Sequence, residues 1–140
     1  MVFDREVLRR KIEHMHQALN QLKIFARQIT LKDLQSLETQ WKVCHGLQVS
    51  AQALLDIGDH ILVAHFDKRV EQYEQIIQEL SVFKVISSGL AKKLKGLGGF
   101  RNIIVHEYDE LDLNIVLENL KKGPPIFEKF IREVLKFSKK

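Results

Sequence analysis

Cysteine, proline and glycine are scarce in this sequence, and each shortage narrows the class of protein. The 140 residues contain one cysteine, Cys44, so an internal disulfide is impossible. The two prolines, Pro124 and Pro125, are adjacent, and most of the seven glycines lie between Gly89 and Gly99. Long stretches therefore contain no residue that breaks a helix, which is typical of a helical protein.

Long apolar runs are also missing. No stretch approaches the roughly 18 apolar residues that cross a bilayer, so we predict no membrane span. The first residues lack the basic flank and apolar run of a signal peptide. We therefore expect a cytoplasmic protein, in whose reducing surroundings Cys44 is a small buried hydrophobic residue.

The spacing of apolar residues predicts helices throughout. Positions three or four apart predict a long first helix after Val7, with Asp4 as its cap; they are Leu8, Ile12, Met15, Leu19, Leu22 and Phe25. Thr30 and Asp33 resemble a capping box that starts a second tract towards Phe66, with a bend near Leu37 to Trp41, so we expect a short helix and a long one.

The second half continues the pattern. Polar residues 67–72 predict a loop, and a helix of about two turns should follow from Tyr73. Ser87 or Ser88 can cap the next helix, in which Gly96, Gly98 and Gly99 mark either a break or a close approach of another backbone. A last helix should begin after an acidic turn and break or kink at residues 123–125.

These elements give the predicted fold. No alternation of β-branched residues and no repeat is present. At 140 residues and 45% apolar composition, the chain fits one domain, 1–140, with a core of its own. We predict an all-α, antiparallel helical bundle of about five or six helices. The aromatic residues are expected in the core or at an interface: Trp41, Phe66, Phe83, Phe127 and Phe130.

The charge changes sign around residue 105. The net charge is +4, with a pI near 9.2. Basic residues precede this point and acidic residues follow it: Lys84, Lys92, Lys93, Lys95 and Arg101, then Glu107, Asp109, Glu110 and Asp112. A solvated helix face followed by an acidic turn explains this pattern, and so does a basic track leading into a phosphate site.

Three polar residues near this point suit RNA cleavage. On a helix, Asn102 and His106 are four residues apart and point away from the apolar side, and Arg101 lies at its edge. Cleavage of RNA without a metal needs a base, an acid and a cation beside the phosphorane, and histidine and arginine suit these roles. One chain offers a single histidine here, so the chemistry favours a two-fold dimer that brings a second His106 to the same cleft.

These residues carry a resemblance to a family. Arginine, a polar residue, three further positions and histidine form the signature of HEPN-domain ribonucleases. The longer stretch from Gly99 to Tyr108 resembles the HepT toxins in particular. The stretch from Leu55 to Ile61 is similar to their third helix, and the resemblance spans essentially the whole chain.

The resemblance implies a function. It implies a HEPN (HepT-like) bundle, a metal-independent endoribonuclease with no cofactor, and a toxin of a type VII toxin–antitoxin pair that dimerises through the motif helix. Arg101 and His106 would be catalytic, with Asn102 orienting them or the RNA. The implied partner is an MntA-type nucleotidyltransferase antitoxin that attaches AMP to the motif tyrosine.

Tyr108 has two interpretations. It is the AMP acceptor that the resemblance implies, or a packing residue that closes the helix end. On a continuous helix Tyr108 lies seven residues after Arg101, hence on the same side, where a phosphate-bearing adduct would compete with RNA for Arg101.

Two other functions stay open. A non-catalytic helical module that binds a nucleotide or substrate for a nucleotidyltransferase is the main alternative, although the intact Arg101 and His106 weigh against it. A metal-binding bundle is the other, because Glu13 and His16 have the spacing of one Glu-x-x-His pair. Asp56 and His60 form a second same-face pair that fits a helix contact better than a metal site.

Overall fold

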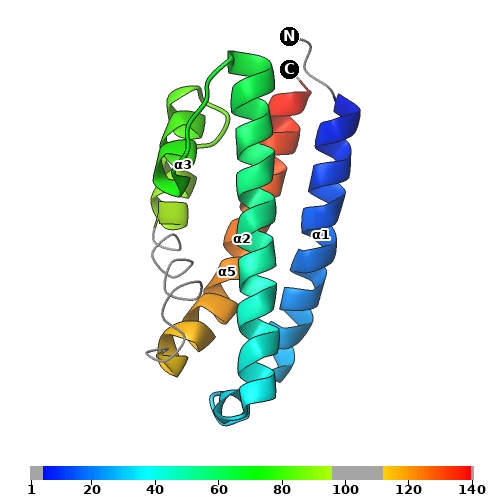
Figure 1. The fold of residues 1–140 in the computed structure, drawn as a ribbon, viewed down its shortest axis with the longest axis vertical. Coiled ribbons are helices and arrows are strands. Elements are labelled where there is room, and N and C mark those ends of the chain that lie inside the picture. The colour runs from blue at the N-terminus through cyan, green and yellow to red at the C-terminus, as the bar shows by residue number, and fades with distance from the viewer. Residues whose placement is uncertain (1–4, 96–111, 140) are drawn as a thin grey trace.

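The protein is a bundle of α-helices (Figure 1). The computed structural model describes residues 5–95 and 112–139. Four helices are α1 (Arg5–Gln28), α2 (Leu37–Phe66), α3 (Tyr73–Val82) and α5 (Leu113–Ser138), with a 3-10 turn, η1 (Asp33–Gln35), before α2. Residues 88–95 are also helical, and no strand occurs within the described ranges. The all-α prediction, with five or six helices, is confirmed.

Three long helices form the body of the bundle. α1 packs against α2 and α5, while α3 packs on the upper half of α2. α1 runs antiparallel to both α2 and α5, as Figure 1 shows. Among the described helices, none is long and apolar enough to cross a membrane.

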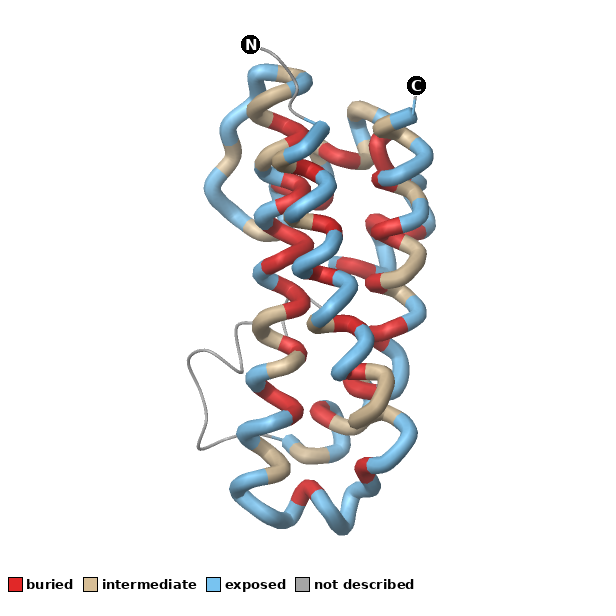
Figure 2. The backbone as a smooth tube through the Cα atoms, turned by 90° about the vertical axis from the view of Figure 1, so that its right-hand side faces the viewer, coloured by how far each residue is buried: buried red, intermediate tan, exposed pale blue. Residues whose placement is uncertain are grey.

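The core follows the predicted apolar stripes. All five buried residues of α1 belong to its predicted stripe: Leu8, Ile12, Met15, Leu19 and Leu22. Figure 2 shows the buried positions turned towards the axis of the bundle and the exposed ones outwards. Each fully buried leucine or isoleucine contributes roughly 1.5–3 kcal/mol, so this inward face holds α1 in place. The proposed Asp4 cap lies outside the described residues.

The capping box at Thr30 is present. The Thr30 amide donates to Asp33 Oδ2 at 2.8 Å, and the Asp33 amide donates to Thr30 Oγ1 at 3.3 Å. The bond from the Thr30 amide, together with one that the Thr30 hydroxyl donates to Oδ2 at 3.0 Å, lowers the pKa of the Asp33 carboxyl. The short helix that it starts is only the single turn η1, because Ser36 then turns the backbone to an extended conformation and caps α2. The expected long helix is present, and the short one is reduced to this 3-10 turn. The bend predicted at residues 37–41 lies instead at Ser36, before α2 begins.

The α2–α3 connection agrees with the sequence. α2 ends at Phe66 and α3 begins at Tyr73, so residues 67–72 form the predicted loop. α3 has 10 residues, close to three turns and longer than predicted. Gly58 allows the close packing of the two helices, since a Cβ there would lie 2.8 Å from Cγ2 of Ile76.

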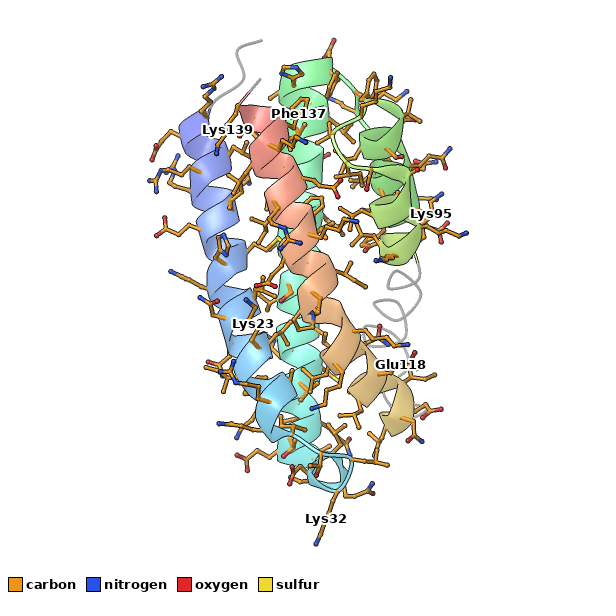
Figure 3. All side chains as sticks on the ribbon, turned by 180° about the vertical axis from the view of Figure 1, so that it is seen from behind. Lys23, Lys32, Lys95, Glu118, Phe137 and Lys139 are labelled. Carbon is orange, nitrogen blue, oxygen red and sulfur yellow. The ribbon has the colours of Figure 1, made fainter. Side chains whose placement is uncertain are left out.

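Of the two outcomes predicted for residues 123–125, a break or a kink, the structure excludes the break. α5 is assigned as one helix from Leu113 to Ser138, with Pro124 and Pro125 inside it. Two prolines remove two amide donors, so the carbonyls one turn earlier lose their usual partners. Buried residues on both sides, including Leu120 and Phe127, keep both halves on the core. The helix changes direction along its length but does not break (Figure 3).

The aromatic residues divide into two groups. Phe127 and Phe130 are buried, and Phe66 stacks on Phe83 with ring centroids 4.3 Å apart. Trp41 is 58% exposed, so it does not lie in the core. Of the two places predicted for it, the interface stays a prediction. Cys44 is fully buried and has no disulfide, as predicted.

Candidate active site

The motif itself lies outside the described residues. Arg101, Asn102, His106 and Tyr108 all fall in the range 96–111, as do the three glycines of the predicted break. Their proposed roles therefore remain predictions. The structure defines the two segments that flank this range, and these segments hold the motif to the bundle.

The upstream flank is the helix at residues 88–95. Ser87 caps it, as predicted: the Leu90 amide donates to Ser87 Oγ at 3.2 Å. Leu90, Ala91 and Leu94 are buried against the core. Near residue 95 the Tyr73 hydroxyl of α3 donates to the Leu94 carbonyl at 3.3 Å. The described part of this helix is thus fixed at its start and again at Leu94.

A second contact joins this flank to α5. The Ser87 amide donates to Glu133 Oε1 at 2.5 Å, and Ser87 Oγ donates to Glu133 Oε2 at 3.2 Å. Hydrogen bonds to a carboxylate are stronger than neutral ones. Glu133 therefore ties the start of the 88–95 helix to the last helix, 46 residues later in the chain.

The downstream flank begins at Asp112. Its carboxylate accepts a hydrogen bond from the Asn114 amide at 2.9 Å and caps α5. Asp112 is the described end of the predicted acidic turn. Val116 and Leu120 then enter the core. The range that carries the motif is accordingly bounded by two capped helices.

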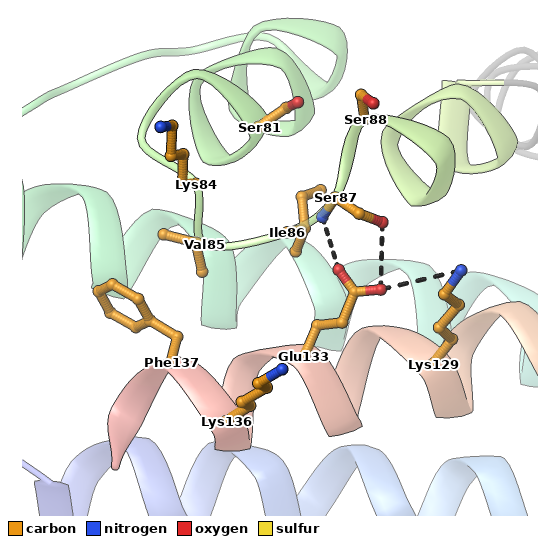
Figure 4. A pocket seen from close by; sticks show the side chains of 10 residues that line it. All are labelled: Ser81, Lys84, Val85, Ile86, Ser87, Ser88, Lys129, Glu133, Lys136 and Phe137. Carbon is orange, nitrogen blue, oxygen red and sulfur yellow. Dashed lines mark hydrogen bonds and ion pairs between the residues drawn. The ribbon is translucent and has the colours of Figure 1, made fainter. Parts of the chain in front are cut away.

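A basic cavity lies beside the upstream flank (Figure 4). It has a volume of about 630 Å³ and lies between α5 and the turn that joins α3 to the 88–95 helix. Its polar lining comes from both segments: Ser81, Lys84, Ser87, Ser88, Lys129, Glu133 and Lys136. Lys129 was not predicted to belong to a site, and Lys136 was predicted to lie at a solvated chain end. Their spacing of seven on one helix face was the available signal.

Asp56 and Asp59 of α2 line a different groove. Two cavities of about 330 and 230 Å³ lie between α1 and α2, and Lys11 and Asp56 line both. The second is also lined by Asp59, His60 and Arg69. Opposite charges therefore face each other across this groove. Asp56 accepts a hydrogen bond from the Gln52 side-chain amide at 3.0 Å, whereas its predicted contact was with His60.

Glu13 and His16, proposed as a possible metal-binding pair, lie on the exposed side of α1. Glu13 pairs with Arg9 at 3.1 Å, and His16 is exposed on α1. Within residues 5–95 and 112–139, no group of three or more histidine, cysteine, aspartate or glutamate side chains could hold a metal ion.

The chain matches known proteins over most of its length. The family model described as ribonuclease HepT-like matches residues 15–134, a range that includes the motif. A tRNA nuclease HepT of Aphanizomenon flos-aquae is 32% identical over 130 residues, covering 91% of this chain and 87% of the relative. An mRNA nuclease HepT of Shewanella oneidensis is 30% identical over 124 residues, covering 89% and 87%.

The fold matches a solved complex as well. A tri-AMPylated HEPN toxin of Shewanella oneidensis, solved with its MNT antitoxin, superposes with a TM-score of 0.85. The two chains are 25% identical, and the match covers 95% of this chain and 99% of that one. Sequence and fold agree, and the chain belongs to the ribonuclease HepT-like family.

Proposed function

We propose that this endoribonuclease is the toxin of a type VII HEPN/MNT toxin–antitoxin pair. One observation carries the proposal: the family match spans the motif, and relatives of at least 30% identity are named nucleases of tRNA and of mRNA. Those names favour a catalyst over a non-catalytic binding module. The substrate class is RNA, and the two names differ in which RNA is cut.

The motif residues supply the chemistry of cleavage. One His106 takes the proton of the 2′-hydroxyl, whose oxygen attacks the adjacent phosphorus. A second histidine protonates the 5′-oxygen as its bond to phosphorus breaks, leaving a 2′,3′-cyclic phosphate. Arg101 stabilises the added charge of the phosphorane, and Asn102 orients Arg101 or the RNA. These steps need no metal ion.

The two histidines come from two chains. Each chain offers one His106 beside Arg101 in the motif, whereas acid and base are separate roles. A two-fold axis through the motif segment brings both copies into one cleft. The active form is therefore a homodimer.

Tyr108 is the regulatory residue of this proposal. A partner nucleotidyltransferase of the MntA type transfers AMP from ATP to its hydroxyl and releases pyrophosphate, in keeping with the tri-AMPylated toxin among the structural relatives. The adduct adds a phosphate that competes with RNA for Arg101. Modification thus silences the nuclease without unfolding it.

Residues 1–140 act as one HEPN domain. A single core cluster contains residues of α1, α2, α3, the 88–95 helix and α5, which supports this assignment. Its substrates would be cellular RNAs, so the proposed site of action is the cytoplasm.

The test is replacement of His106 by alanine. Loss of the base and acid should lower RNA cleavage by a factor of about 10² to 10⁴ and abolish growth inhibition. Tyr108→Phe is the matched control, since it keeps the ring and removes only the acceptor oxygen, and it should cleave RNA as the wild type does. Helix content by circular dichroism and mass by light scattering should be unchanged in both variants.

Two outcomes would overturn the proposal. Full cleavage by His106→Ala contradicts the catalytic role of the histidine. A Tyr108→Phe variant as inactive as His106→Ala makes the tyrosine part of the catalytic machinery instead of the modification site.

A further inference from the structure

Positive charge is concentrated in two segments of the chain. Residues 80–95 contain Lys84, Lys92, Lys93 and Lys95 and no acidic residue. Residues 129–139 contain four basic residues and one acidic residue, Glu133. Together these segments carry a net charge of +7, which exceeds the +4 of the whole chain, so the rest is net negative.

The fold brings the two segments side by side. The Ser87–Glu133 hydrogen bonds join them, and the basic cavity of Figure 4 lies between them. Lys84 enters this cavity from one segment, and Lys129 and Lys136 from the other. Segments that are more than 40 residues apart in sequence therefore form one surface.

The surface extends along the 88–95 helix towards the motif. Ser88 lines the cavity, and Lys92 and Lys95 follow it by four and seven residues, hence on the same side of the helix. Both lysines are exposed. Lys95 precedes Arg101 by six residues, so at most roughly 20 Å of extended chain separates them.

Little of this charge is neutralised nearby. Glu133, the acidic residue of the cavity lining, accepts the two Ser87 hydrogen bonds and lies 4.0 Å from Lys129. Within the described ranges Lys84, Lys92, Lys95 and Lys136 form no ion pair. Their ammonium groups are available to an external polyanion.

We propose that this surface binds the phosphate backbone of the RNA substrate and leads it to the motif. We call it the basic track and define it as Lys84, Lys92, Lys95, Lys129 and Lys136. The inference rests on the proposed function, because the track needs a nucleic acid partner. Lysine binds phosphate as a point charge, so the track contributes affinity without base readout.

The experiment measures binding and cleavage separately. The probe for binding is a fluorescent 2′-O-methylated RNA of mixed sequence, which has no free 2′-hydroxyl and is not cut. The test variant is Lys92→Gln with Lys136→Gln, and the control variant is Lys32→Gln with Lys42→Gln. The control removes two exposed lysines near η1, away from the track.

The salt dependence should identify the track. Each lost phosphate contact reduces the magnitude of the slope of log K against log salt by about 0.7 for single strands. The slope of the test variant, which lacks two lysines, should therefore be smaller in magnitude by about 1.4. The same relation predicts on the order of 20-fold weaker binding at 0.1 M salt. For cleavable RNA of the same sequence, KM should rise while kcat at saturation stays unchanged. The control variant should match the wild type.

The outcomes separate this inference from the proposed function. If the wild type cleaves RNA and both variants bind it equally well, the track is wrong and the nuclease assignment stands. If the wild type binds the probe through the track but cleaves nothing, the proposed function fails. Unchanged RNA binding together with loss of binding to an acidic protein partner would overturn the inference in favour of a protein interface.

Discussion

At the scale of single residues, hydrogen bonds within one turn set where the helical segments begin. Ser87 was expected as a cap because a serine precedes an apolar stripe, and Thr30 and Asp33 because they have capping-box spacing; both sets of bonds are present. For Trp41 the choice between core and interface could not be made from the sequence, because its exposure depends on what packs over it. Local chemistry fixes a cap, whereas burial is a property of the whole bundle.

Cys44 should be unreactive in the native protein. Burial raises the pKa of its thiol to about 11, so almost no thiolate forms at neutral pH, and its side chain has no exposed surface. Reaction with a disulfide reagent at pH 8 should therefore be slow and limited by opening of the bundle. The chain has one cysteine, so the signal in denaturant gives the full stoichiometry for comparison. Native labelling at the rate of an exposed thiol would contradict the burial.

At the scale of elements, helix number was predicted better than helix continuity. Two adjacent prolines predicted a break or a kink at residues 123–125, and proline chemistry alone allows either. α5 nevertheless continues, because Leu120 before the prolines and Phe127 after them are both buried in the same core. Tertiary packing decided between two outcomes that the local rule leaves open.

The packing of α3 on α2 depends on Gly58. In Gly58→Ala the new Cβ would lie 2.8 Å from Ile76 Cγ2 and 3.0 Å from Leu80 Cδ1. Ile76 is β-branched and stiff, and both residues are buried, so the helices must separate. The steric clash should lower the free energy of unfolding by about 1–3 kcal/mol. The higher helix propensity of alanine should offset roughly 1 kcal/mol of this loss. Urea denaturation followed by circular dichroism measures the difference.

Gly89→Ala is the matched control for this substitution. Gly89 also lies in a helix, but a Cβ there meets nothing within 4 Å. It should stabilise the protein by a few tenths of a kcal/mol, up to about 1. Equal effects of the two alanines would show that the close approach at Gly58 is not important.

At the scale of the whole molecule, the candidate site was predictable only in part. The motif could be recognised in the sequence because its residues are contiguous. The roles of those residues stay predictions. The basic track combines Lys92 with Lys129 and Lys136, whose segments meet through the Ser87–Glu133 contact. The spacing of Lys129 and Lys136 places them on one helix face, but no periodicity reveals a contact with a segment so far away in the sequence. Only the lysines before the motif were therefore connected with a phosphate site.

A site shared by two chains makes a quantitative prediction. Wild type and His106→Ala should be unfolded together in equal amounts, refolded and assayed for RNA cleavage. If both histidines are needed in each site, only wild-type pairs are active, about one quarter of random dimers. The mixture should then have about a quarter of the activity of wild type at the same total concentration.

The alternative gives a different number. If each chain cleaved RNA alone, the mixture would keep about one half of the wild-type activity. A mixture prepared without unfolding is the control, since its chains have not exchanged. An activity of one half after verified exchange would rule out the composite site.

The exposure of Trp41 has a practical consequence. It is the single tryptophan of the chain and lies in the first turns of α2, near η1. Its indole ring is largely in water already in the folded state, with 58% of its surface exposed. Unfolding therefore changes its surroundings little, and intrinsic fluorescence is a poor monitor of folding in this protein. The same property makes the ring a sensitive optical reporter for any molecule that covers that end of the bundle.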